Sequence, residues 1–203
     1  MLAVQNVYDF TVGKILNAAF IETHRNWEMR DICFPDLWTV CYSVDGHVTY
    51  TMGDTNQFVN KDDVLFFPPG NSRSAYSSPS SPWKFIVVKF RLYDVSQETE
   101  KLLRAIPILM KFPSQMLLQK FKELDIAWKT KKPGYLIKCK GLIYAIMYTI
   151  MSEAIGTLEY TKHVKQLSEV LTTIANNQGD NYSVQSLSEM VGFSPSYFSA
   201  IFK

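Results

Sequence analysis

Residues 37–52 read LWTVCYSVDGHVTYTM, and this stretch decides the fold class. Two runs rich in Val, Tyr, Thr and Trp, residues that favour strands, flank the pair Asp45-Gly46. Such a pair between two strand-like runs predicts a hairpin, because the tight turn needs a positive φ that Gly adopts without strain. The stretch therefore predicts a β domain built from short strands.

Further strand-like runs follow at close spacing, DVLFFPPG at 63–70 and WKFIVVKF at 83–90, and the Ser/Pro-rich residues 77–82 form a loop between them. Several short strands of this kind indicate a sandwich or a barrel. After about residue 95 the apolar residues recur at helical spacing instead. The chain is therefore expected to be α+β, with the strands first.

Two apolar stripes predict an antiparallel helical hairpin around Pro133-Gly134. The first consists of Leu117, Phe121, Leu124 and Trp128, and the second of Leu136, Cys139, Ile143, Ile146 and Ile150. The second stripe has the 3-4 spacing of a helix that packs along another helix, either within the chain or in a homodimer. Eight lysines between residues 111 and 140 make either a solvated helix face or an auxiliary DNA-facing surface.

Composition places the 203 residues among soluble globular proteins, with 47% hydrophobic and 20% charged residues. A net charge of +2 is too small to mark the whole chain as a nucleic-acid binder. Three cysteines without metal-ligand spacing are expected to be reduced thiols in a cytoplasmic protein. The N-terminus has no signal-peptide pattern, and the apolar run at 141–151 is too short to cross a bilayer.

From Thr161 on, the residues follow the pattern of helix, turn, helix, turn, helix. Ser183 is expected to cap one helix, Gly192 to permit a tight turn, and Ser194 with Pro195 to open the last helix. Phe198, Ile201 and Phe202 then face inward, and the opposite face carries small and polar residues that let a helix approach base edges in a major groove. An ordinary amphipathic surface helix is the alternative.

The string SVQSLSEMVGFSPSYFSAIFK, residues 183–203, closely resembles the first helix-turn-helix of AraC/XylS-type transcription regulators. Ser188 departs from the usual Ala of that family, and Ala200 stands where a long basic residue is common. The resemblance implies a second helix-turn-helix after residue 203, so the chain is expected to be a truncated regulator that binds DNA poorly by itself. The resemblance and the helical wheel together give these candidate DNA-binding residues: Ser183, Ser194, Ser196, Tyr197, Ser199, Ala200 and Lys203.

Residues 45–76 resemble, more loosely, the middle of the cupin-like β-barrel that precedes the reader in such regulators. The resemblance implies three regions: an effector-sensing barrel at 1–95, a helical connector or dimerisation region at 96–158, and a partial helix-turn-helix bundle at 159–203. Asp62 occupies a usual Gly position, which Asp tolerates in a left-handed conformation. Strand alternation and position beside the loops indicate a set of aromatic residues and one Arg as the wall of a binding site. Aromatic rings and a guanidinium together suit a sugar or a small carboxylate. These candidate effector-binding residues are Trp38, Tyr42, Tyr50, Arg73, Tyr76 and Trp83, and an ordinary barrel core with a surface Arg is the alternative.

Catalytic and metal-binding patterns are not found in the sequence. The three histidines, His24, His47 and His163, lack the His-x-His pair of metal-dependent cupin enzymes, and no nucleophile elbow, P-loop or dinucleotide fingerprint occurs. We therefore expect a cofactor-free, effector-responsive transcription regulator that is not an enzyme and binds double-stranded DNA and a small molecule, as a homodimer and away from membranes. The alternative is a ligand-binding or dimerisation module without DNA binding.

Overall fold

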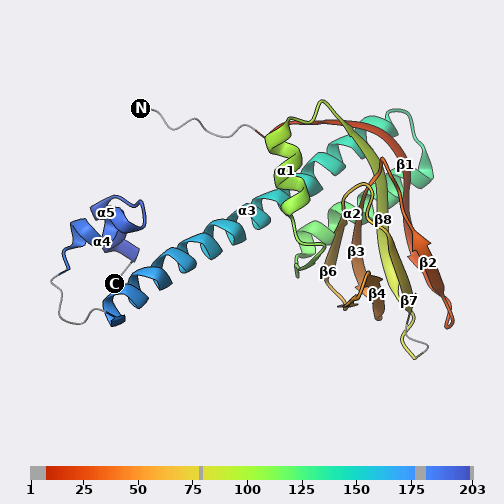
Figure 1. The fold of residues 1–203 in the computed structure, drawn as a ribbon. Helices are drawn as coiled ribbons and strands as arrows, with labels where there is room; N and C mark the ends of the chain where they lie inside the picture. Colours follow the sequence, from red (N-terminus) through yellow and green to blue (C-terminus); the bar gives the residue numbers. More distant parts are fainter. Residues whose placement is uncertain (1–7, 78–79, 177–181, 202–203) are drawn as a thin grey trace. The chain divides into compact units, whose positions relative to one another are not determined.

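The computed structural model describes residues 8–77, 80–176 and 182–201, which divide into two compact units (Figure 1). The first unit, residues 1–151, holds the nine strands found in the described residues together with α1, α2 and the first part of α3. The second unit, residues 152–203, holds the rest of α3 with α4 and α5.

Two antiparallel sheets form the β domain of the first unit. The five-stranded sheet has the order β1 (Thr11–Glu22), β8 (Lys84–Tyr93), β3 (Trp38–Asp45), β6 (Asp63–Phe67) and β9 (Leu109–Lys111). The four-stranded sheet has the order β2 (Glu28–Ile32), β7 (Arg73–Ser77), β4 (Val48–Met52) and β5 (Thr55–Val59). The chain alternates between the sheets from β5 to β8, which is the jelly-roll arrangement of cupins. The predicted cupin-like β domain, and with it the α+β class, is confirmed.

The turn at Asp45-Gly46 is present, but the hairpin predicted there is wrong. Gly46 has φ +74°, yet β3 and β4 on either side of it belong to different sheets. A Cβ at Gly46 would lie 2.1 Å from the carbonyl oxygen of Pro82, so the residue also permits a close approach of two loops. The hairpin forms one turn later, where Met52 pairs with Thr55 across Gly53-Asp54. Asp62 has φ +66°, as its position predicts.

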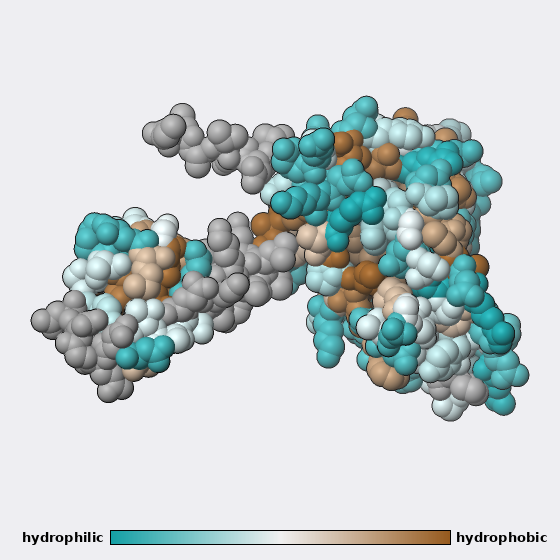
Figure 2. Space-filling model, viewed as in Figure 1, coloured by the Kyte–Doolittle hydropathy of each residue, from teal (hydrophilic) through white to brown (hydrophobic). Residues whose placement is uncertain are grey.

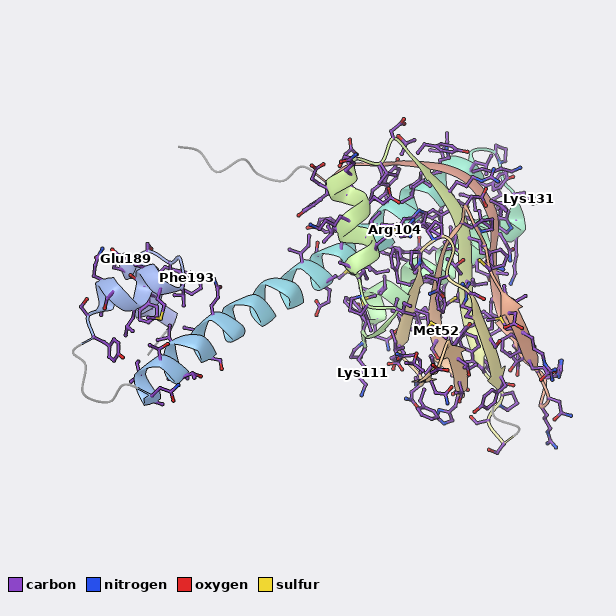
Figure 3. The ribbon with its side chains drawn as sticks, viewed as in Figure 1. Met52, Arg104, Lys111, Lys131, Glu189 and Phe193 are labelled. Atoms are coloured by element: carbon purple, nitrogen blue, oxygen red, sulfur yellow. The ribbon has the colours of Figure 1, made fainter. Side chains whose placement is uncertain are left out.

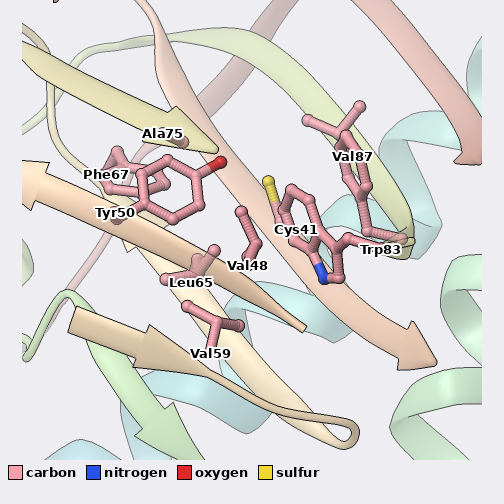
Figure 4. Close-up of a cluster of buried hydrophobic side chains, with 10 residues drawn as sticks. Cys41, Val48, Tyr50, Val59, Leu65, Phe67, Ala75, Trp83 and Val87 are labelled. Carbon is pink, nitrogen blue, oxygen red and sulfur yellow. The ribbon is translucent and has the colours of Figure 1, made fainter. Parts of the chain in front are cut away.

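Apolar side chains from both sheets form the core of the β domain (Figure 4). Trp83 is fully buried there, stacks on Phe85 with ring centroids 3.7 Å apart, and donates a 2.9 Å hydrogen bond from Nε1 to Ser43 Oγ. Tyr50 packs between Trp83 and Phe67, with centroid distances of 5.9 and 5.2 Å. This cluster joins the two sheets, because its members come from strands of each.

Helices α1 (Gln97–Ala105), α2 (Gln115–Thr130) and α3 (Tyr135–Asn176) follow the strands. Ser96 and Ser114 cap the first two by accepting backbone N–H bonds, and Lys131 ends α2 in a left-handed conformation in the turn before α3 (Figure 3). Helix α2 packs on the five-stranded sheet, against β1, β8 and β3. Strand β9, between α1 and α2, was not expected from the helical spacing of this region.

The second predicted stripe, on α3, is buried within the single chain. Cys139, Ile143, Ile146 and Ile150 are each at most 1% exposed, whereas Leu136 is 45% exposed and was wrongly included. Packing within the chain is therefore the correct interpretation of this stripe, and its buried side chains are not available to a partner. The predicted boundary between residues 158 and 159 falls inside the continuous helix α3.

Side chains of α2 and α3 bind the outer edge of β1. The backbone N–H of Phe20 donates to Asp125 Oδ1 over 2.7 Å, and the N–H of Val12 donates to the Tyr144 hydroxyl over 2.9 Å. The Tyr144 ring also stacks on Phe10, with centroids 5.7 Å apart. Strand β1 is therefore bonded to β8 on one side and to two helices on the other.

In the second unit, α4 (Val184–Met190) and α5 (Pro195–Ile201) are joined by a turn at Gly192, which has φ +69°. Glu189 and Phe193 lie on either side of this turn (Figure 3). Ser183 caps α4 in a capping box with Ser186. Phe198 of α5 is 2% exposed and packs in a small core whose other buried members are Val170, Leu187 and Val191.

Candidate functional site

A cavity of about 270 Å³ lies between the two sheets of the β domain. Most of its wall is apolar, and the polar groups are few. The lining residues are Asn17, Ile21, Trp27, Met29, Ile32, Phe34, Thr39, Cys41, Tyr50, Arg73, Phe85, Val87 and Lys89.

Arg73 is the most strongly buried charge at this cavity, with 5% of the residue exposed. Its Nη1 donates to the carbonyl oxygen of Asn71 over 3.0 Å, and Nε is buried without a hydrogen-bond partner in the described part of the chain. The guanidinium lies 3.8 Å from the ring centroid of Phe67 and 5.6 Å from that of Phe34. Burial lowers the pKa of Arg73, but a guanidinium keeps its charge at neutral pH.

Lys89 brings a second positive charge to the cavity. Its Nζ lies 4.3 Å from the ring centroid of Phe34, so both cations contact the same aromatic side chain. Burial lowers the pKa of Lys89, and the neighbouring charge of Arg73 lowers it further. Lys89 pairs across β3 and β8 with Thr39, whose Oγ1 is buried without a hydrogen-bond partner among the described residues.

The remaining titratable groups of the cavity wall are neutral at physiological pH. Burial raises the pKa of the Cys41 thiol to about 12 and raises that of the Tyr50 phenol well above its usual value. No Asp or Glu is among the lining residues. The cavity therefore carries two positive charges and no negative one.

Tyr50 and Arg73 are the two predicted effector-binding residues that line the cavity. Trp38 and Tyr42 do not, because β3 presents its other face, with Thr39 and Cys41, to the cavity. Trp38 packs on Phe66 and Tyr42 on Phe121 of α2, with centroids 5.4 and 5.7 Å apart. The assignment of Trp38 and Tyr42 to the cavity wall was thus wrong by one residue in register.

Tyr76 and Trp83 also lie outside the cavity wall. Tyr76 is 52% exposed, since its neighbours Arg73, Ala75 and Ser77 take the inward positions of β7. Trp83 lies in the core behind the wall, stacked on the lining residue Phe85. As predicted, the two residues flank residues 77–82, with Tyr76 in β7 and Trp83 directly before β8, but neither of them lines the cavity.

Lys89 and Thr39 also line this site, although they were not among the residues predicted for it. A usable signal was present in β8, where Phe85, Val87 and Lys89 alternate on one face and Lys89 interrupts the otherwise apolar run from Phe85 to Phe90. A cation at an inward position of such a strand is uncommon without a partner or a function.

The candidate DNA-binding residues lie in the second unit, on or beside α4 and α5. Ser183, Ser194, Ser196, Tyr197 and Ala200 are exposed, and Ser199 is half-buried. The hydroxyls of Ser183 and Ser194 accept N–H bonds from the helices that follow them, over 3.0 and 3.3 Å. Lys203, together with Phe202, lies outside the described residues.

The lysine-rich segment at 111–140 and the surface of the β domain are the other places where a partner was considered. The eight lysines from 111 to 140 are exposed or half-buried, and Lys129 and Lys138 form ion pairs with Asp125 and Glu123. On the face drawn in Figure 2, hydrophilic residues predominate on the β domain and hydrophobic areas are small. In residues 8–77, 80–176 and 182–201, no helix has the length and apolarity needed to cross a bilayer. The same residues contain no group of three His, Cys, Asp or Glu side chains placed to hold a metal ion.

The jelly-roll strands and the cavity between them define a cupin-type binding domain. The AraC-like ligand binding domain matches residues 18–124, which include every described strand except β1 in full, the entire cavity wall apart from Asn17, and α2 as far as Leu124. The chain belongs to this family. The match covers the sensor part of the predicted regulator and ends before α3.

Solved structures resemble parts of the chain at low identity. A predicted oxalate decarboxylase from Thermotoga maritima is 15% identical, with a TM-score of 0.36 over 38% of this chain and 68% of its own. A Klebsiella pneumoniae protein with a double-stranded β-helix domain is 17% identical, with a TM-score of 0.35 over 45% and 78%. The cupin domain of Schizosaccharomyces pombe Cnp3 is 15% identical, with a TM-score of 0.36 over 41% and 59%. No curated protein matches the chain.

Lys89 gives the site a measurable pH dependence. Because its pKa is lowered in the folded protein, the unfolded state binds more protons between that pKa and the usual value of about 10.4, and Lys89's contribution to stability rises with pH in this window. Lys89→Met is therefore expected to stabilise the protein at neutral pH by a margin that shrinks towards about pH 10. Urea unfolding of both proteins across this range measures the margin.

Lys84→Met is the matched control for this experiment. Lys84 lies on the same strand, but its Nζ is at the surface, 3.6 Å from Glu22 and 3.5 Å from Asp45. Its removal is expected to give no gain at neutral pH. A Lys89→Met margin that stays constant with pH would contradict the assignment of a destabilised charge to Lys89, whose charged and titratable neighbours are Arg73 and Cys41.

Proposed function

We propose that the protein is an effector-responsive transcription regulator, in which the cavity of the AraC-like domain binds a small molecule and the terminal helices read DNA. The observation that carries the proposal is the charged, mostly apolar cavity inside an AraC-like ligand binding domain. Such concave, apolar sites with a few convergent polar groups are typical of small-molecule binding. In this proposal the protein is a sensor and not an enzyme.

The arrangement of the terminal helices supports the DNA-reading part. Phe198 anchors α5 to α4 and α3 of the second unit, and the residues around it on α5, Ser196, Tyr197 and Ala200, are exposed. Small and polar side chains at these positions fit the close approach of a recognition helix to a major groove. The resemblance of residues 183–203 to the first helix-turn-helix of AraC/XylS-type regulators supports the same role.

Strand β1 supplies a physical connection between the cavity and the helices. Asn17 and Ile21 of β1 line the cavity, while the neighbouring N–H of Phe20 binds Asp125 of α2 and that of Val12 binds Tyr144 of α3. An effector that fits one position of β1 better than another would therefore bias the helices that lead to the reader. The bias equals the difference in its affinity for the two arrangements.

DNA binding by the protein tests this proposal. Fluorescence anisotropy with DNA from upstream of the gene, at two salt concentrations, is expected to give a steep loss of affinity with salt and a preference over unrelated DNA. Binding that has neither property would favour the alternative, a ligand-binding or dimerisation module without a DNA reader. The alternative is supported by the same cavity, but it leaves the exposed face of α5 without a role.

A further inference from the structure

We propose that the cavity takes a small organic carboxylate with an apolar body, with Arg73 as the principal anchor and Lys89 as a second positive charge. The proposal rests on the sensor function above and specifies the chemical class of its effector. It selects a carboxylate over the sugar that the sequence alone left equally open.

The two positive charges at the cavity favour an anionic ligand over a neutral one. Arg73 and Lys89 both contact the ring of Phe34, and neither forms an ion pair with a carboxylate among the described residues. Placing two cations close together in a largely buried site is unfavourable unless an anion joins them. A bound anion removes this imbalance, whereas a neutral sugar leaves it in place.

Two buried polar groups at the cavity wall that lack hydrogen bonds also favour a carboxylate. The Arg73 Nε–H and the Thr39 Oγ1 are both buried at the cavity wall without a partner in the described part of the chain. Thr39 is 2% exposed and lies directly opposite Lys89 in the β3–β8 ladder, so its hydroxyl and the ammonium start from adjacent positions. A carboxylate accepts hydrogen bonds at two oxygens, which matches donors of this kind.

The aromatic side chains of the cavity wall indicate that the part of the ligand outside its carboxylate is apolar. Trp27, Phe34 and Phe85 line the cavity, and their rings offer an apolar surface to the ligand. A sugar needs hydrogen bonds around its whole ring, and buried polar groups left unpaired lower affinity. A volume of about 270 Å³ holds roughly nine waters, which limits the ligand to on the order of ten non-hydrogen atoms.

Isothermal titration of the whole chain with three acids and their amides tests the proposal. The probes are benzoate, phenylacetate and hexanoate, each compared with the neutral amide of the same shape, together with glucose and inorganic phosphate. At least one acid is expected to bind roughly ten- to a hundredfold more tightly than its amide, since the charge-assisted bonds are lost with the charge. Glucose and phosphate are expected to bind more weakly than that acid.

Arg73→Met and Lys89→Met are expected to remove most of the preference of acid over amide, while Lys84→Met and the surface variant Arg91→Met keep it. If Arg73→Met does not fold, the titrations of Lys89→Met test the proposal, because Lys89 is only half-buried. Amides that bind as well as acids, acids that do not bind, or phosphate that binds as well as the acids would each overturn the proposal. DNA binding is measured separately, so failure of the acid preference and failure of the regulator function give different results.

Discussion

Replacing Trp83 by alanine is expected to lower the free energy of unfolding of the β domain by about 3–5 kcal/mol, the usual cost of truncating a fully buried Trp. Trp83 fills the core between the sheets, where it stacks on Phe85 and packs against Tyr50. Its loss also leaves the buried hydroxyl of Ser43 without the indole donor. Urea unfolding followed by far-ultraviolet circular dichroism measures the effect without relying on tryptophan fluorescence.

Tyr76→Ala is the matched control for Trp83→Ala. Both residues are aromatic and flank the same loop, but Tyr76 is 52% exposed and Trp83 is fully buried. The Tyr76 variant is expected to change stability by no more than about 0.5 kcal/mol, as is usual for surface positions. Equal losses in the two variants would show that the core described around Trp83 is misplaced.

Phe198→Ala is expected to unfold α4 and α5 while the β domain stays folded. Truncating a buried Phe costs about 3–5 kcal/mol, and the core around Phe198 has three other buried members among the described residues, Val170, Leu187 and Val191. A core of this size has little stability to lose. Hydrogen exchange is expected to accelerate in peptides from residues 182–201 and to stay unchanged in β8.

The control for Phe198→Ala is Ser196→Arg on the same helix. Ser196 is exposed, so the longer side chain is expected to leave hydrogen exchange in α4 and α5 unchanged and to alter the affinity of the protein for DNA. Rapid exchange in the Ser196 variant, or none in the Phe198 variant, would mean that the two faces of α5 have been assigned the wrong way round.

Sequence patterns predicted the positions of turns and helix caps better than they predicted which strands pair. Gly192 and Ser183 were placed correctly because a positive φ and a helix cap are local requirements, satisfied within a few residues. The turn at Gly46 was found for the same reason, but the sheet that each flanking strand joins depends on residues far along the chain. Local chemistry therefore predicted the turn and not the strand pairing.

The inward face of β3 shows why the cavity was only partly predicted. Every residue from Trp38 to Ser43 is buried, because one face of the strand borders the core and cavity while the other is covered by α2 and neighbouring side chains. When both faces are apolar, alternation no longer indicates which one points inward. The large rings of Trp38 and Tyr42 suggested a binding wall, whereas the smaller Thr39 and Cys41 leave the space that a ligand needs.

The bonds from Asp125 and Tyr144 to the backbone of β1 have a consequence for association between copies of the chain. An unpaired outer strand offers a row of N–H and C=O groups on which another molecule can add a strand, the usual start of β-aggregation. Strand β1, with 12 residues, is the longest of the described strands, and two of its outward N–H donors are bonded to helix side chains. The same contacts that connect the sheet to its helices therefore protect this edge from intermolecular strand addition.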